Sequence, residues 1–189
     1  MNRRGFTRRG AVAGLAAVGA AALAGCSNGV GTNGAMVVDQ RVDATRDYLL
    51  TRYPSTADLE RKASGVLWMP LITKAGFGFG GSYGTGALRI DNVTVDYYEV
   101  VQANFGVQAG IQQYAHALFF MTDEALRKFR TSSGWSIGAD AEYALIDQGG
   151  NLSADTVTAL DPVIAFVFGQ AGVIAGATLE GTKYRRIIP

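Results

Sequence analysis

The sequence predicts an α+β fold: a mostly antiparallel, strongly curved or partly closed β-sheet, with N-terminal helices and one helix inserted between strands. A helical apolar pattern near the N-terminus gives way to alternating patterns that dominate the rest of the chain. Several alternating segments carry glycine and other small residues on one face, which lets a sheet curl or receive another element closely. The chain has 189 residues and shows no internal repeat, which suits a single domain.

The first 25 residues are expected to be an export signal rather than part of the fold. Asn2–Thr7 (NRRGFT) resembles a twin-arginine signal, and an apolar stretch leads to Leu23–Cys26 (LAGC), which resembles a bacterial lipobox. The apolar stretch before Cys26 is shorter than the roughly 20 residues that a transmembrane helix needs. We therefore expect an exported protein with a lipid anchor on Cys26. Ser27 favours the outer membrane, with the domain facing the periplasm.

Removal of this signal changes the charge balance. The whole chain has 17 basic and 16 acidic residues; the signal holds four arginines and no acid, which leaves 13 basic residues against 16 acidic ones and a formal charge of −3. No overall basic field remains, so nucleic acid is not an expected partner. Cys26 is the only cysteine, which excludes an intrachain disulfide.

Residues 26–36 are rich in glycine and asparagine and are interpreted as a flexible tether, which leaves 37–189 as the domain. A helix is predicted over 37–53, ended by Pro54. One of its faces is apolar, with Val38, Val42, Leu49 and Tyr53. Its polar face mixes Asp39, Asp43 and Asp47 with Arg41, Arg46 and Arg52, unlike a Lys/Arg-rich membrane-surface helix.

Two more helices are expected. Ser55 and Asp58 form an S-x-x-D capping box for a short helix that ends near residue 63. Thr122 is the expected N-cap of a helix through Phe129, with acids in its first turn and bases in its last. Strands are predicted at about 65–69, 77–90, 95–104, 107–121, 135–146, 162–168 and 171–182. A turn at 73–76 makes residues 65–88 a curved, glycine-rich hairpin.

Four segments, in order, resemble signatures of the SYLF domain family. They are GVLWMPLITKAGFGFGGSYGTGAL (65–88), FGVQAGIQQYAHALFFMTDEAL (105–126), GWSIGADA (134–141) and GVIAGATLEG (172–181). The resemblance covers roughly residues 40 to 185. It implies a non-enzymatic, lipid-binding module that recognises acidic phospholipid or phosphoinositide-like headgroups. Eukaryotic relatives bind or bundle actin, which implies a structural, protein-binding module of the cell envelope as the alternative.

The resemblance also implies that basic residues contact the headgroup. The candidates are Lys74 on the predicted turn, Arg61, Lys62, Lys183, Arg185 and Arg186. A further basic group, Arg127, Lys128 and Arg130, lies in the predicted third helix. Binding to an acidic membrane through such residues must weaken as salt rises.

Enzymatic chemistry is not expected. His116, the single histidine, lies in an apolar run without the companions of a catalytic triad or a metal site. Residues 76–81 match G-x-G-x-x-G, but no helix follows, so the dinucleotide-binding interpretation fails. Asp140 and Glu142 share a predicted strand face; a solvated face is favoured over a cation site, which would need further oxygen ligands. No cofactor, catalytic residue or metal ligand is therefore assigned.

Overall fold

The computed structural model describes residues 32–140, 144–146, 161–172, 179 and 181–189. The helices are α1 (Gly34–Arg52), α2 (Thr56–Lys62) and α3 (Asp123–Thr131). The strands are β1 (Gly65–Ile90), β2 (Val93–Phe120), β3 (Trp135–Ser136), β4 (Ala144–Ile146), β5 (Val163–Gly172) and β6 (Lys183–Ile187). The predicted α+β class is confirmed, with two helices ahead of the sheet and one between strands. None of these helices has both the length and the apolar character of a transmembrane helix.

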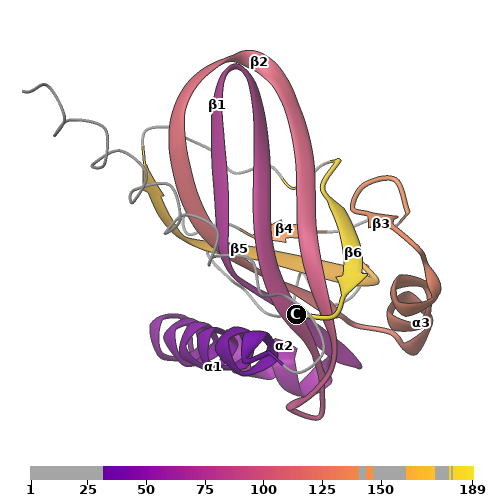
Figure 1. Ribbon diagram of the computed structural model, residues 1–189. Helices are drawn as coiled ribbons and strands as arrows, with labels where there is room; N and C mark the ends of the chain where they lie inside the picture. Colours follow the sequence, from indigo (N-terminus) through magenta and orange to yellow (C-terminus); the bar gives the residue numbers. More distant parts are fainter. Residues whose placement is uncertain (1–31, 141–143, 147–160, 173–178, 180) are drawn as a thin grey trace, which may run out of the picture.

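Strand β2 is the centre of the sheet. The strand order is β3-β6-β2-β5-β4, and β1 also pairs with β2. β6 pairs with residues 97–101 of β2, and β5 pairs with residues 112–120. All of these pairings are antiparallel except that of β4 with β5, which is parallel. Figure 1 shows β1 and β2 rising together from the base of the molecule, bending over and returning, as an arch.

The hairpin is longer than the sequence predicts. Pairing between β1 and β2 runs from Gly65 opposite Phe120 to Ile90 opposite Val93, with three register shifts. The predicted turn at 73–76 is therefore wrong, as is the break between 104 and 107. Glycines and bulges let the strands bend without interrupting the ladder, and sequence patterns alone read such bends as chain turns. The actual turn is Asp91-Asn92, whose φ angles of 49° and 63° suit a tight two-residue hairpin turn.

The bend brings the two halves of β1 against each other. A Cβ atom on Gly86 would overlap the Trp68 carbonyl oxygen, and one on Gly84 would overlap the Leu71 carbonyl oxygen. A Cβ on Gly80 would lie 2.8 Å from the Ala75 carbonyl oxygen. The bare glycine face that the alternating pattern predicts is thus where another backbone approaches closely.

The curved sheet has an apolar core on each side. The core on the inner face includes residues of α3 and of the strands β3 and β6. Its largest side chains are Leu67, Met69, Tyr98, Tyr114, Leu118, Phe120, Phe129, Trp135 and Tyr184. The outer face packs on α1 and α2; its members include Val38, Val42, Leu49, Leu59, Trp68, Phe119, Phe166 and Phe168. The apolar face predicted for the first helix is therefore confirmed as the face that packs on the sheet.

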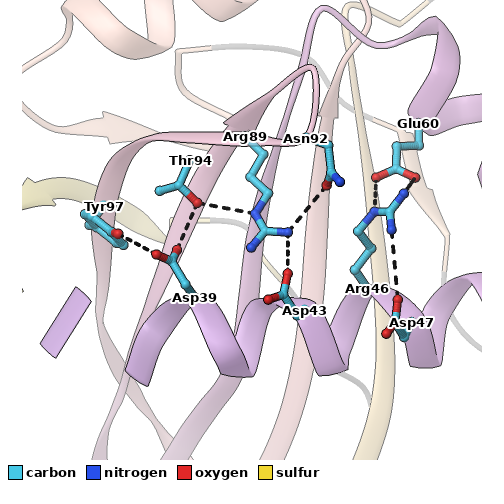
Figure 2. Close-up of polar contacts among 9 residues, drawn as sticks. All are labelled: Asp39, Asp43, Arg46, Asp47, Glu60, Arg89, Asn92, Thr94 and Tyr97. Atoms are coloured by element: carbon cyan, nitrogen blue, oxygen red, sulfur yellow. Dashed lines mark hydrogen bonds and ion pairs between the residues drawn. The ribbon is translucent and has the colours of Figure 1, made fainter. Parts of the chain in front are cut away.

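A polar network fixes α1 to the base of the hairpin (Figure 2). Asp39 accepts hydrogen bonds of 2.8 Å from Thr94 and from Tyr97. Asp43 forms an ion pair of 2.7 Å with Arg89, whose side chain is only 8% exposed. These acidic residues of α1 thus contact the protein itself, which explains why its polar face is not uniformly basic.

A second part of the network joins α1 to α2. Arg46 donates two hydrogen bonds to Glu60, of 2.5 and 3.0 Å, and lies 3.9 Å from Asp47 (Figure 2). The capping box predicted for α2 is wrong, because the Ser55 side chain makes no capping bond. The predicted cap of α3 is confirmed, since the Thr122 side chain accepts a hydrogen bond from the Ala125 N–H.

The last predicted strands differ from those observed. The segment expected to be a strand over 135–146 contains the two residues of β3, a turn at 138–140, and β4. Residues 141–143 lie outside the described residues, as do 173–178 and 180 of the strand predicted at 171–182. β5 ends at Gly172, and the Thr182 N–H bonds back to the Leu179 carbonyl in a turn. β6 was not predicted, because its basic residues hide the apolar alternation.

Candidate anion-binding site between helix α3 and strand β6

Helix α3 begins the site. Its apolar face is buried in the inner core, where the ring of Phe129 lies 4.6 Å from Tyr98 and 4.7 Å from Phe120, between ring centroids. Glu124 in the first turn and Lys128 in the last form an i, i+4 ion pair of 2.9 Å, which suits the helix dipole. The Lys128 ammonium lowers the pKa of Glu124. Anchored in this way, α3 presents the side chains of its outer face at a fixed position.

Arg186 of β6 joins α3 to the sheet. Its Nη2 donates a hydrogen bond of 2.6 Å to the Arg130 carbonyl oxygen. Both guanidinium groups share Asp96 of β2, Arg130 at 3.0 Å and Arg186 at 3.4 Å. Asp96 is 13% exposed. One largely buried carboxylate therefore holds two guanidinium groups side by side. Two positive charges against one negative charge leave this group of three side chains with a net charge of +1.

A pocket of about 560 Å³ lies over these arginines. Its described lining is Asp123, Leu126, Arg127, Arg130, Thr131 and Arg186. Arg127 is exposed and forms no salt bridge with any described residue. Three guanidinium groups thus face one pocket, and one of them is unpaired. Arginine presents a planar fork of N–H donors that matches phosphate oxygens, so this arrangement suits a phosphate-bearing anion.

A second, larger pocket of about 620 Å³ is a weaker candidate. It lies between the start of α1, the returning half of β1 and the end of the chain. Arg41 is the one charged side chain among the described residues that line it. Because an acidic headgroup needs several positive partners, the α3–β6 pocket is the better match.

The structure separates most of the predicted headgroup residues. Arg61 and Lys62 are exposed on α2, where Arg61 pairs with Asp58. Lys74 is in β1 rather than on a turn, and its side chain is buried, with 6% exposed. Cys26 lies outside the described residues. These candidates therefore do not form one patch with the basic end of the chain.

The alternation of β6 divides its own basic residues. Lys183 and Arg185 are two apart, so they share a face of β6, and both are exposed. Arg185 donates to Glu99, with a distance of 2.7 Å from Nε to Oε1. Arg186 instead faces α3. Of the predicted set, only Arg186 lines the basic pocket, and Arg127 and Arg130 complete it. The period-2 pattern of a strand could have placed Arg186 on the opposite face of β6 from Lys183 and Arg185. No sequence signal, however, could have shown that Arg186 lies beside α3.

The structure explains two other titratable residues. His116 is fully buried in the inner core, its Nε2 lies 2.8 Å from the Tyr184 hydroxyl, and burial lowers its pKa to about 3. Asp140 lies in a turn and accepts a hydrogen bond of 2.6 Å from the Ser136 N–H. Glu142, its predicted companion on a strand face, lies outside the described residues. Among the described residues, no group of His, Cys, Asp and Glu side chains is arranged to hold a metal ion.

Part of the chain matches a known family model. Residues 101–186 match the family model Ysc84, described as Las17-binding protein actin regulator. These residues match the SYLF domain family. No curated protein matches the chain.

The matched part of the chain contains the candidate site. It runs from the middle of β2 through α3 to Arg186 in β6, and so includes all three pocket arginines. The glycine-rich β1 precedes the matched residues, yet it pairs with β2 along nearly its whole length. The SYLF family is a family of lipid- and actin-binding modules.

Proposed function

We propose that this protein is a non-enzymatic lipoprotein of the cell envelope whose SYLF domain binds acidic phospholipid headgroups in the α3–β6 pocket. The observation that carries the proposal is the group of three arginines around this pocket, of which Arg127 is unpaired among the described residues. Phosphate groups form charge-assisted, often bidentate hydrogen bonds with such side chains. The lipid anchor on Cys26 would keep the domain at a membrane surface, where weak headgroup contacts add to the anchor.

Vesicle flotation with residues 27–189, which lack the anchor, tests the proposal. The protein is expected to float with vesicles that contain phosphatidic acid or phosphatidylglycerol, to stay behind with pure phosphatidylcholine, and to lose binding as salt rises. Arg127→Met is expected to reduce binding at least tenfold. Arg61→Met is the matched control, because Arg61 is an exposed arginine on α2, outside the pocket lining. Equal binding by the two variants would contradict the proposed site.

A protein partner is the alternative function. The matched family model is described as a Las17-binding actin regulator, which favours a binding role that does not depend on lipid. In that case the flotation experiment gives no binding to acidic vesicles at low salt. Crosslinking of the anchored protein in intact cells would then identify the envelope protein that it contacts.

A further inference from the structure

The pocket at the start of α1 lies outside the part of the chain that matches the family model. Its volume is about 620 Å³, and its described lining comes from the start of α1 and the two residues before it, from Tyr83 and Thr85 of β1, and from Ile187 and Pro189. None of these residues falls within residues 101–186, which the family model matches. Sites for small molecules in proteins have volumes of about 300–1,000 Å³. The pocket therefore has the size of a small-molecule site.

Much of the pocket wall is apolar and accessible. Val37 of α1 is 40% exposed, and Tyr83 of β1 is 52% exposed. Val101, whose Cα pairs with that of Tyr83 across the hairpin, is also exposed and extends the apolar surface beyond the pocket. Small-molecule sites combine apolar and aromatic walls of this kind with a few polar groups that orient the ligand. The pocket thus offers one aromatic ring and aliphatic side chains to an apolar group.

Arg41 supplies the charge of this pocket. It is the one charged side chain in the described lining, it is exposed, and it has no hydrogen bond or ion pair with any described residue. The other two arginines of α1 have partners. Arg46 donates to Glu60, and the Arg52 guanidinium lies 5.6 Å from the centroid of the Tyr53 ring. The arginine of α1 that lacks a described partner is therefore the one that lines the pocket.

Sequence and fold both explain why Arg41 is unpaired among the described residues. Its helical neighbours at positions 37, 38, 44 and 45 include no acid, so no i, i+3 or i, i+4 ion pair can form. Asp39 accepts hydrogen bonds from two side chains of β2. Glu99, which pairs with Thr85 of the pocket wall across the hairpin, is bound to Arg185. One positive charge thus lies beside apolar walls while these two acids are occupied elsewhere.

We propose that this pocket binds a small aromatic monocarboxylate, with its carboxylate on Arg41 and its ring against Tyr83 and Val37. A guanidinium group and a carboxylate form two parallel N–H···O hydrogen bonds, and their single charges balance. A ring of the ligand gains further from contact with the ring of Tyr83. A phosphomonoester carries a charge of about −1.5 to −2 at pH 7, which one arginine does not balance. This site is separate from the α3–β6 pocket and does not depend on the function proposed for that pocket.

Titration calorimetry of the full chain, purified in a non-ionic detergent, tests this site, with titration into detergent alone as the blank. The probe is 3-phenylpropanoate. Its amide, 3-phenylpropanamide, has the ring without the charge, and propanoate has the charge without the ring. Phenylphosphonate joins the ring to a group that can carry two charges. We expect 3-phenylpropanoate to bind at least about tenfold more tightly than any of the other three, since it alone satisfies both the arginine and the ring.

Arg41→Met is the decisive variant, because it removes the charge from an exposed position and keeps a side chain of similar bulk. It is expected to bind 3-phenylpropanoate at least about tenfold more weakly and the amide as weakly as the unchanged protein does. Arg52→Met is the matched control, since Arg52 is an exposed arginine of the same helix outside the pocket lining. Tyr83→Ser is expected to weaken binding of 3-phenylpropanoate and to leave that of propanoate unchanged.

Arg127→Met separates the two pockets, because it removes the unpaired cation of the α3–β6 pocket and is expected to leave binding of 3-phenylpropanoate unchanged. Four results would overturn the proposal. They are no binding of 3-phenylpropanoate at up to about 10 mM, binding of the amide or the phosphonate as tight as that of the acid, unchanged binding by Arg41→Met, and loss of binding in Arg127→Met.

Discussion

His116 on β2 and Tyr184 on β6 meet inside the inner core, where the Tyr184 hydroxyl lies 2.8 Å from His116 Nε2. The two residues are 68 positions apart in the sequence. His116 is fully buried, its Nδ1 has no hydrogen-bond partner, and burial lowers its pKa to about 3. The histidine is therefore neutral in the folded protein, and the fold depends on its staying so.

Acidification is expected to destabilise the domain through this histidine. In the unfolded chain His116 binds a proton near its ordinary pKa of 6.5, whereas in the folded chain it does so only near 3. Its contribution to stability is present above pH 6.5 and is lost as the pH falls toward 3; between about pH 7 and about pH 5 the loss is about 2 kcal/mol. Urea unfolding across this range measures it.

Carboxylates also titrate in part of this range, so the comparison needs a variant. His116→Gln can still hydrogen-bond to Tyr184 but cannot titrate. The free energy of unfolding of this variant is expected to fall less steeply with acidification than that of the unchanged protein. Equal slopes would mean that His116 is not the group responsible.

Gly86→Ala tests the closure of the arch. A Cβ atom at this position would overlap the Trp68 carbonyl oxygen, which belongs to backbone that cannot move aside without disturbing the hairpin. We expect a loss of about 3 kcal/mol in the free energy of unfolding, at the upper end of the usual cost of overpacking. Thr85→Ala, on the opposite face of the same strand, is the control and is expected to cost about 1 kcal/mol or less. Chemical denaturation of both variants decides the comparison.

Glu60→Gln tests how α1 is held against α2. Glu60 accepts both hydrogen bonds from Arg46, and the two side chains are 18% and 26% exposed. Loss of the carboxylate charge is expected to cost about 1 kcal/mol, since the pair is bidentate and mostly shielded from water. Asp47→Asn changes the other acid near Arg46, which is 77% exposed and 3.9 Å away, and is expected to cost less than about 0.5 kcal/mol. A similar cost for both variants would count against a special role for Glu60.

Cys26→Ser tests the anchor. If Cys26 carries the lipid, the variant is expected to leave the membrane fraction of cells, whereas the unchanged protein stays there after a carbonate wash. Metabolic labelling with a palmitate analogue is expected to mark the unchanged protein only. Retention of the variant in the membrane after the wash would exclude a lipid on this cysteine as the main attachment.

Much of the fold follows from local sequence patterns, and the exceptions have physical causes. The helices were predicted within a few residues because prolines, the 3.6-residue period and, for α3, the Thr122 cap are local signals. The long hairpin was divided at 73–76 because glycine marks both turns and bends, and only tertiary contacts decide between them. Lys74 was predicted to lie on an exposed turn because the glycines near it were interpreted as a turn rather than as a bend. β6 was missed because Lys183, Arg185 and Arg186 dilute its apolar pattern.

The candidate site was predictable only in part. The charge of Arg186, in a basic segment with Lys183 and Arg185, marks it as a candidate. The sequence shows Arg127 and Arg130 as a basic group but does not join them to Arg186, because the pairing of β2 with β6 is a long-range contact. The shared carboxylate of Asp96, which holds two of these arginines, carries no local signature at all.

The position of β2 at the centre of the sheet also affects how the chain folds. The turn at Asp91-Asn92 lets β1 and β2 associate early, since the residues beside it are close in sequence. The other edge of β2, however, pairs with β5 and β6. The last pair between β2 and β6 joins Tyr97 to Ile187. During synthesis, the edge of β2 that pairs with β6 would thus stay unpaired until β6 had left the ribosome. The ladder then closes late, by long-range contacts of the kind that make folding slow.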